Sequence, residues 1–294
     1  MCVNLQARLL FNYLRRIAMN FLTYEQQRSF SDDGFVQLPA FLPQETAQIL
    51  HAELCRNDPF QRVGPLDYLG FTEPSEDLLG RIVRSERLIH MAETLLSGSC
   101  YHFHSKVVRK PPGDEFVLDW HQDYGSWYKD GCLMPLLVTA VIALTPANCN
   151  NGCLRFLRGS HRMGRMDRLA EGHESYSYFS LAPRRLEAVL ERFDEIPMDM
   201  RPGDALFFHA NTLHASGSNL SHDSRILFEI TYNAVTNQPV FAEQSYHQFT
   251  PLEPVADDEL GSGSIINYQN LVDVNDTDDI RSGIFRRRFD PGLC

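Results

Sequence analysis

An imidazole and a carboxylate lie two residues apart in the tripeptide His121-Gln122-Asp123. On a β-strand, residues two apart point to the same face of the sheet, so both side chains could bind one ion. A second imidazole, His214, follows the apolar segment 205–209. Two histidines and one carboxylate from separate strands form the facial triad of non-haem Fe(II) oxygenases, which leaves coordination positions open for other ligands. The spacing therefore predicts an iron site at these three residues.

His209 is a competing candidate ligand, because it lies five residues before His214. It ends a strand-like segment of aliphatic and aromatic residues, where a histidine is more often packed or hydrogen-bonded than bound to a metal. We therefore expect His214 to be the ligand and His209 to be structural.

Arg225 opens a strand-like segment eleven residues after His214. Alternation places it on one face of that strand, with the large apolar residues on the other. If that face is buried, the guanidinium needs an anionic partner, and its planar fork matches a carboxylate. A dicarboxylate that binds the metal through its other end would supply this partner. Without the metal motif, Arg225 would instead be a surface or salt-bridged residue.

Glu229 shares the face of Arg225 and must be paired or hydrated, because an isolated buried charge is very costly. Two partners are open: Lys106 of a preceding strand, or a cationic group of the substrate such as an amine. Tyr124, Trp127 and Phe208 could surround such a cation with aromatic faces. The alternative is that two or more of these aromatic residues belong to the hydrophobic core.

The elements that must position these residues are mainly short strands with flanking helices. Segments rich in β-branched and aromatic residues follow one another from Tyr101, separated by turns, which is typical of a sandwich or barrel. The predicted strands are 35–38, 101–109, 116–123, 137–144, 153–158, 195–200, 204–209 and 225–232. The predicted helices are 23–30, 44–56, 85–96 and 184–193. Thr23 and Gln26 fit a capping box at the start of the first helix.

Taken together, these motifs resemble the phytanoyl-CoA dioxygenase family of Fe(II)/2-oxoglutarate oxygenases over about residues 20–240. Within that family, the segment from Trp120 to Trp127 is most similar to ectoine hydroxylases. The other matching segments are Asp33-Gly34-Phe35-Val36, Asn151-Gly152-Cys153-Leu154, Gly159-Ser160-His161, Gly203-Asp204 and His214 through Ser216 and Gly217 to Arg225.

The resemblance implies a double-stranded β-helix core, that is, a cupin-like jelly roll with flanking helices. It also implies iron ligation by His121, Asp123 and His214. Arg225 and Ser216 would hold the distal carboxylate of 2-oxoglutarate. His104 and Lys106, on the strand that precedes the triad, are expected as further contacts to this co-substrate.

The implied enzyme is a dioxygenase that uses Fe(II), 2-oxoglutarate and O₂ to hydroxylate an unactivated C–H bond, with release of succinate and CO₂. We expect its substrate to be a small polar, amine-bearing metabolite. Glu229 replaces a phenylalanine that packs on ectoine in the similar enzymes, so ectoine itself fits poorly. Asp123 disfavours halogenation, because halogenating relatives lack the carboxylate ligand.

Two alternative functions stay open. The substrate could be an acyl-CoA or another lipid-like molecule. The chain could also be a non-catalytic, metal-binding cupin-like module, although such a module would not need Arg225 and Ser216.

The 294-residue chain has a net charge of −11, which argues against binding to nucleic acid or to an anionic membrane. The longest apolar run, 136–144, is too short to span a membrane and is expected to be a buried strand. Seven scattered cysteines without a CxxC pair predict neither a disulfide framework nor a structural zinc site, and they favour a reducing cytoplasm. We expect a monomer or homodimer.

The expected organisation is a single oxygenase domain over residues 19–250, with the jelly-roll core from about residue 101. Residues 1–18 form an N-terminal extension that is rich in arginine and free of acids, so organellar import stays an alternative to a cytoplasmic location. Residues 251–294 are expected to be a loosely packed acidic extension. Segment 172–182 is predicted to be a lid or an ordered surface loop.

Overall fold

The computed structural model describes residues 21–63, 66–71, 74–166, 182–240, 249–260 and 265–266. Its helices are α2 (Tyr24–Asp33), α3 (Gln44–Asn57), α4 (Leu78–Val83), α5 (Glu86–Leu96), α6 (Tyr124–Trp127) and α7 (Pro183–Leu190). Its strands are β1 (Phe35–Leu38), β2 (Gln61–Val63), β3 (Leu66–Phe71), β4 (Cys100–Lys110), β5 (Leu118–His121), β6 (Leu137–Ala143), β7 (Leu154–Leu157), β8 (Glu195–Pro197), β9 (Ala205–His209), β10 (His214–Ser216) and β11 (Arg225–Ala234).

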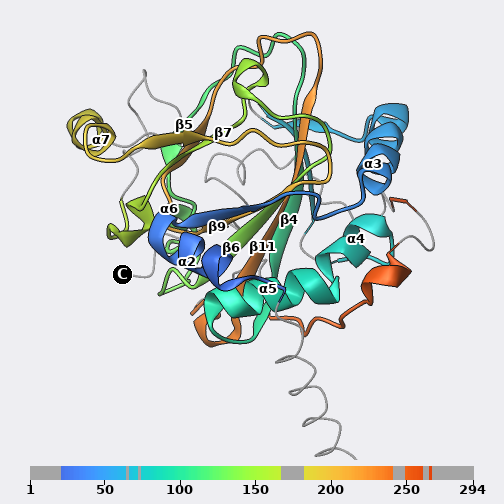
Figure 1. Cartoon of the computed structure of the whole chain (residues 1–294), viewed down its shortest axis with the longest axis horizontal. Coiled ribbons are helices and arrows are strands. Elements are labelled where there is room, and N and C mark those ends of the chain that lie inside the picture. The colour runs from blue at the N-terminus through green and yellow to red at the C-terminus, as the bar shows by residue number, and fades with distance from the viewer. Residues whose placement is uncertain are drawn as a thin grey trace, which may run out of the picture.

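The strands form two antiparallel sheets, as Figure 1 shows. The larger sheet has the order β1-β9-β6-β11-β4-β3-β2, and the smaller one has the order β5-β10-β7-β8. Neighbours in both sheets are often distant in sequence, which is typical of a jelly roll. Helices α3, α4 and α5 lie on the side of the large sheet that faces away from the small one. The predicted fold class, a mainly β jelly roll with flanking helices, is confirmed.

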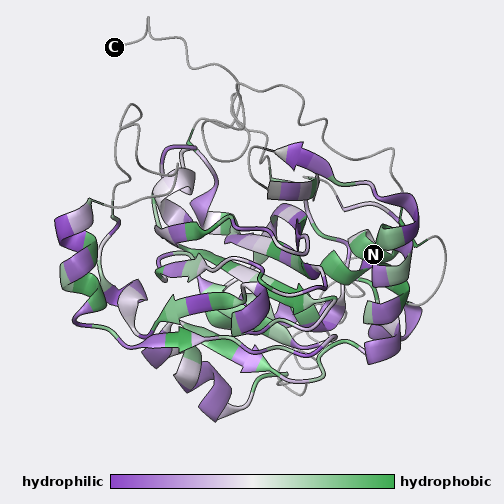
Figure 2. Cartoon of the chain, turned by 90° about the horizontal axis from the view of Figure 1, so that it is seen from above, coloured by the Kyte–Doolittle hydropathy of each residue, from purple (hydrophilic) through white to green (hydrophobic). Residues whose placement is uncertain are grey.

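Strand β6 shows how the hydrophobic core is divided. Every one of its residues is buried, because it lies between β9 and β11 in the middle of the large sheet. Ile142 faces the helices and packs in the cluster that α3, α4 and α5 cover. Its neighbour Val141 packs in a second cluster between the sheets. Figure 2 accordingly shows hydrophobic strands in the interior and hydrophilic residues on the outer sides of the helices.

Several local predictions are confirmed. The capping box of Thr23 and Gln26 is present at the start of α2, which ends at Gly34 in the left-handed conformation, φ 86°. The segment 61–83 was not predicted, and it forms β2, β3 and α4. Strand β3 extends the large sheet beside β4, so its stability comes from tertiary pairing that local sequence does not reveal.

The prediction of a loosely packed extension from residue 251 is wrong for the part that the structure describes. Leu260 and Ile266 are buried in the cluster of α3, α4 and α5. The Val255 N–H donates to the Arg84 carbonyl, and the Glu86 N–H donates to the Val255 carbonyl. The acidic composition of this segment masked the apolar residues that attach it to the domain.

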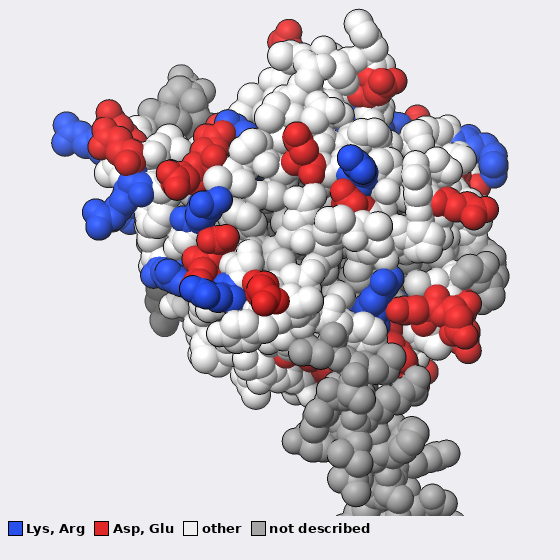
Figure 3. Space-filling model, in the orientation of Figure 1, with Lys and Arg blue, Asp and Glu red and all other residues white. Residues whose placement is uncertain are grey.

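The predicted N-terminal extension and residues 172–181 of the predicted lid lie outside the described residues. None of the helices in the described ranges combines the length and apolar character that crossing a membrane requires. On the face of the molecule in Figure 3, basic and acidic side chains are interspersed.

Candidate active site

The two candidate histidine ligands lie on neighbouring antiparallel strands. His121 is the last residue of β5, His214 is the first residue of β10, and they are direct cross-strand partners. Their ring centroids are 4.2 Å apart. Phe208 and Phe156 pack on the His214 ring, with centroid distances of 4.8 and 5.6 Å. The strand pairing therefore brings both imidazoles to one place between the sheets.

Asp123 reaches the histidines by a different route from the predicted one. The prediction placed it on the strand of His121, but β5 ends at His121, and Asp123 is the N-cap residue of helix α6, with φ −61° and ψ −39°. The chain leaves the sheet at Gln122, whose side-chain amide donates to the Asn211 carbonyl over 2.8 Å. The turn still places Asp123 Oδ1 3.6 Å from His121 Nε2 and 3.8 Å from His214 Nε2.

Hydrogen bonds to the backbone leave one ring nitrogen of each imidazole available to bind a metal. His121 Nδ1 lies 2.7 Å from the Asp119 carbonyl oxygen, and His214 Nδ1 lies 3.1 Å from the Thr212 carbonyl oxygen. A carbonyl oxygen only accepts hydrogen bonds, so each Nδ1 carries the proton and each Nε2 presents its lone pair. The ligand atoms of the three buried residues all lie within 4.8 Å of one another. Two imidazoles and one carboxylate in this arrangement fit Fe(II).

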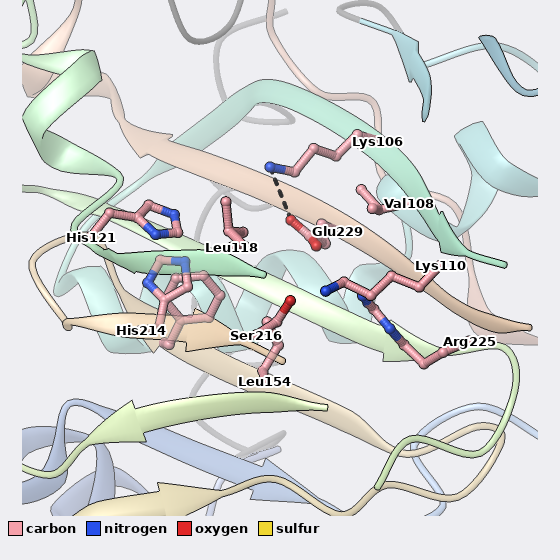
Figure 4. Close-up of a pocket in the computed structure, with 11 residues that line it drawn as sticks. Lys106, Val108, Lys110, Leu118, His121, Leu154, His214, Ser216, Arg225 and Glu229 are labelled. Carbon is pink, nitrogen blue, oxygen red and sulfur yellow. Dashed lines mark ion pairs between the residues drawn. The ribbon is translucent and has the colours of Figure 1, made fainter. Parts of the chain in front are cut away.

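A pocket extends from the histidines between the two sheets. Figure 4 shows the histidines at one end of the pocket and two basic side chains, Lys110 and Arg225, at the other. The pocket is lined by Lys106, Val108, Lys110, Leu118, His121, Leu154, Phe208, His214, Ser216, Arg225 and Glu229. Polar side chains that could bind a ligand therefore occur along the whole length of the pocket.

The basic end of the pocket contains two buried cations. Arg225 is 2% exposed, and its Nε atom has no hydrogen-bond partner among the described residues. Lys110 is 1% exposed and donates to the carbonyl oxygens of Phe116 and Gly217. Burial and the nearby Arg225 lower the pKa of Lys110 to about 7, and burial lowers the pKa of Arg225 to about 10. An anion between these groups would relieve their repulsion.

Lys110 was missed by the sequence analysis, although one signal could have revealed it. Residues 104, 106, 108 and 110 share one face of β4 by alternation, and Lys106 was already placed on that face. The ladder pairs Lys110 with Arg225 and Lys106 with Glu229. Once the register between β4 and β11 is known, it follows that Lys110 lies opposite Arg225 and Lys106 opposite Glu229.

Lys106 and Glu229 form an ion pair in the wall of the pocket. Lys106 Nζ lies 3.0 Å from Glu229 Oε2, and the side chains are 18% and 15% exposed. Burial opposes the charge on Lys106, but Glu229 and the nearby Asp123 outweigh it and raise the pKa of the ammonium group. Of the two partners predicted for Glu229, the structure shows the internal one.

The other predicted residues divide between the pocket and its surroundings. Phe208 lines the pocket. Trp127 and Tyr124 pack instead in an apolar cluster with Tyr101 and Phe103, and the Tyr124 hydroxyl donates to the Leu133 carbonyl.

His104 and His209 lie outside the pocket lining. The ring of His104 is buried, with its centroid 5.8 Å from that of Trp127. His209 accepts a hydrogen bond from the Asn211 N–H through Nδ1. Burial lowers the pKa of His209 to about 4, so it is neutral at pH 7. It is a packed, hydrogen-bonded residue, as expected.

The sequence is similar to that of characterised oxygenases. Residues 30–227 match the family model of phytanoyl-CoA dioxygenase (PhyH). The chain is 28% identical over 239 residues to an ectoine dioxygenase of Bordetella bronchiseptica, covering 74% of this chain and 77% of the relative. It is 31% identical over 203 residues to an L-proline trans-4-hydroxylase of Streptomyces griseoviridis, covering 63% and 75%.

The fold is similar to those of several solved structures. EctD from S. alaskensis, determined with 2-oxoglutarate and 5-hydroxyectoine, superposes with a TM-score of 0.67 at 20% identity, covering 84% of this chain and 89% of that one. The epimerase SnoN, determined with Fe³⁺, α-ketoglutarate and nogalamycin RO, gives a TM-score of 0.60 at 22% identity, covering 79% and 93%.

The fold and the triad together define a jelly-roll oxygenase of the non-haem iron class. Because the family model matches two thirds of its length, the chain belongs to the phytanoyl-CoA dioxygenase family. The predicted enzyme class, an iron- and 2-oxoglutarate-dependent dioxygenase that uses O₂, is confirmed by this membership and by the curated relatives. The predicted similarity to ectoine hydroxylases is confirmed as well.

Proposed function

We propose that this dioxygenase hydroxylates an unactivated C–H bond of a small polar metabolite that bears an amine. The observation that supports this most directly is the Lys106–Glu229 ion pair in the pocket wall. Each member of the pair satisfies the other when no substrate is present, so a substrate that enters this part of the pocket must either pack on both charges or replace these contacts with its own charged groups. The pair therefore suits a substrate that is itself charged.

The basic end of the pocket suits the co-substrate. Arg225 and Lys110 offer N–H donors there, and Ser216 offers a hydroxyl group. The distal carboxylate of 2-oxoglutarate would neutralise these neighbouring cations, and the fork of Arg225 can bind it bidentately. His104, which we expected as a further contact, is absent from the described pocket lining.

The triad His121, Asp123 and His214 would hold Fe(II) at the other end of the pocket. When bound, the metal supplies O₂ activation coupled to oxidative decarboxylation of 2-oxoglutarate. The protein itself orients the substrate and the co-substrate and excludes water from the site. Phe208 and Leu154 provide apolar walls beside the histidines, so a reactive site there is shielded from solvent.

A zwitterion could bind both members of the ion pair. Its ammonium group would approach the carboxylate of Glu229, and a carboxylate would approach the ammonium group of Lys106. Each pocket group then exchanges its internal partner for one on the substrate, so no buried charge is left alone. A neutral substrate would have to pack on an ion pair and would gain no such contact.

The relatives act on molecules of this kind. Two of them are an ectoine dioxygenase and an L-proline trans-4-hydroxylase, and both ectoine and L-proline are small carboxylates that contain nitrogen. A long acyl chain, in contrast, would bury apolar surface against the charged Lys106 and Glu229. The alternative of an acyl-CoA or lipid-like substrate is therefore disfavoured.

A succinate-release screen tests this proposal. The iron-loaded enzyme is supplied with 2-oxoglutarate and with L-amino acids, cyclic amino acids, ectoine, or long acyl-CoA thioesters. Each amine is matched by its N-acetyl derivative, which has the same skeleton without the ammonium charge. We expect one or more of the free amines to stimulate succinate release above the background rate, and their N-acetyl derivatives to fail. Equal stimulation by both forms, or stimulation by acyl-CoA alone, would show that the proposal is wrong.

A further inference from the structure

Two thiols and a carboxylate converge at a second place, outside the pocket. Cys149 begins the short 3₁₀ helix Cys149–Asn151, Cys153 directly precedes β7, and Asp199 lies between β8 and β9. Their ligand atoms, two Sγ atoms and a carboxylate oxygen, all lie within 4.8 Å of one another. Cys153 is 1% exposed, whereas Cys149 and Asp199 are exposed. The cluster is therefore open on one side to an ion from solution.

The backbone holds these three residues together without any ion. Both chain neighbours of Asp199 form backbone hydrogen bonds with residues that flank the cysteine loop. The Met198 N–H donates to the Leu154 carbonyl over 2.9 Å, and Met200 exchanges two backbone hydrogen bonds of 2.9 Å with Ala147. These ties lie on either side of the loop that contains both cysteines. The loop therefore presents its thiols opposite Asp199.

The loop itself is ordered by its own side chains. Asn148 and Asn151 form a capping box around the 3₁₀ helix, and the Cys153 N–H donates to the Asn148 carbonyl over 3.0 Å. Gly152 has a φ of 77° and packs against the Gly217 carbonyl. Little conformational freedom would be lost when an ion binds to a loop that is already fixed.

In the part of the chain that the structure describes, no ion pair compensates the carboxylate of Asp199. Among the described residues, only its backbone carbonyl is engaged, by the side-chain amide of Gln37 over 2.8 Å. Two thiols and a carboxylate form a soft anionic ligand set, which divalent zinc prefers.

We propose that Cys149, Cys153 and Asp199 bind a thiophilic divalent cation, Zn²⁺, at a site separate from the iron triad. Three protein ligands leave a fourth tetrahedral position for water on the exposed side. The ion would tie the start of β7 to the chain after β8. The spacing of the cysteines predicted no structural zinc site, because the third ligand is 46 residues from the second and only the fold brings it near.

A redox-active disulfide is the main competing role for the two cysteines. Burial is the largest influence on Cys153, and together with Cys149 and Asp199 it raises the pKa of this thiol to about 12. The thiolate is both the form that attacks peroxides and the form that binds metals. The raised pKa therefore slows oxidation, and it requires zinc binding to release a proton from Cys153. A disulfide also gives no role to the carboxylate of Asp199.

Cobalt binding to the full-length, reduced and metal-free protein tests the proposal. Co²⁺ bound to thiolates gives an intense near-ultraviolet charge-transfer band, which the nitrogen and oxygen ligands of the triad cannot produce. We expect this band in the wild type and also in a variant that carries both His121→Ala and His214→Ala. It should be lost, together with one equivalent of bound cobalt, in Cys149→Ser. Because Cys149 is exposed, this variant should fold normally. Asp199→Asn should weaken cobalt binding about tenfold or more.

The matched control is Cys55→Ser, which removes another exposed cysteine and should leave the band unchanged. A reduced wild type without the band, or a band that survives in Cys149→Ser, would overturn the proposal.

A second experiment treats the protein with hydrogen peroxide, with and without Zn²⁺, and measures formation of the Cys149–Cys153 disulfide. If Zn²⁺ does not slow formation of a Cys149–Cys153 disulfide, the two thiols are a redox pair and the zinc site is wrong.

Discussion

At the scale of single residues, the backbone sets the chemistry of the triad. The carbonyls of Asp119 and Thr212 fix the Nδ1 protons of His121 and His214, so that both Nε2 atoms are available on the same side as Asp123. The residue types could be predicted from the sequence, because the spacing of the HxD motif and the later histidine is distinctive. The route of the chain after His121 could not, since the turn depends on the bond between Gln122 and Asn211.

Removal of any one ligand should abolish turnover. We expect His121→Ala, Asp123→Ala and His214→Ala to lose succinate formation while keeping a cooperative thermal unfolding transition. Each removes a metal bond, but little of the hydrophobic core. His209→Ala is the matched control, because this half-buried histidine lies outside the pocket lining, and the variant should retain stoichiometric iron. Near-normal turnover in any triad variant would show that its ligand is wrongly assigned.

The affinity for 2-oxoglutarate should fall as the pH rises through about 7. Below that pH, Lys110 carries the proton that a bound carboxylate needs. Above it, the free enzyme has lost this proton, whose pKa burial and Arg225 hold near 7. Binding must then take up a proton, which weakens it by up to about tenfold per pH unit. Anaerobic titration of the Fe(II) enzyme measures the Kd, and Lys110→Met should remove the pH dependence.

Arg225→Ala is the control for this pH effect. It removes a buried, charged partner of the carboxylate and should cost about 2–5 kcal/mol of 2-oxoglutarate binding below pH 7. Because Arg225 also lowers the pKa of Lys110, the fall in affinity should move to higher pH in this variant. A pH-independent Kd in the wild type would contradict the role of Lys110.

At the scale of elements, alternation along β4 and β11 was the most reliable guide. It placed Arg225 and Glu229 on one inward face, and the ladder opposes them to Lys110 and Lys106. Alternation failed where an element ended early, as at Asp123. It also gave no information on which inward residues reach the pocket: Tyr124 and Trp127 were expected there, and both pack in a neighbouring cluster.

The loop before β7 should tolerate no side chain at Gly152. Its φ of 77° is unfavourable for alanine, and an added methyl group would overlap the Gly217 carbonyl oxygen. We expect Gly152→Ala to lower the free energy of unfolding by about 2–4 kcal/mol, from the backbone conformation and the overlap together. Chemical denaturation measures the loss. Gly98→Ala, where the added methyl meets no atom within 4 Å, should change it by about 0.5 kcal/mol or less. Equal effects would contradict the close packing of this loop.

At the scale of the whole molecule, the strands of the jelly roll could be predicted from the sequence more accurately than the point at which the folded domain ends. The strand-like segments from residue 100 onwards match the observed strands within a few residues, because their apolar patterns are strong. The C-terminal segment was misjudged, since its acids obscured Leu260 and Ile266, which complete the core beside α5. Asp257 also pairs with Arg87 of that helix over 3.2 Å.

Truncation should reveal this attachment. A chain that ends at residue 248 loses the buried side chains of Leu260 and Ile266, and we expect it to be less stable by about 3–6 kcal/mol. A chain that ends at residue 266 keeps every described contact of the segment and is the matched control. Thermal unfolding of both proteins measures the difference. Equal midpoints would show that the segment contributes nothing to the fold.

The substrate kinetics of Glu229→Gln test the central claim most directly. With the best amine from the succinate screen, this variant should raise the substrate KM at least about tenfold, because it removes the carboxylate that meets the ammonium group. Its rate of 2-oxoglutarate turnover without substrate should stay close to that of the wild type, whereas its thermal unfolding midpoint should fall, because Lys106 loses its ion-pair partner. An unchanged substrate KM, or efficient turnover of a long acyl-CoA, would contradict the assignment of an amine-bearing substrate.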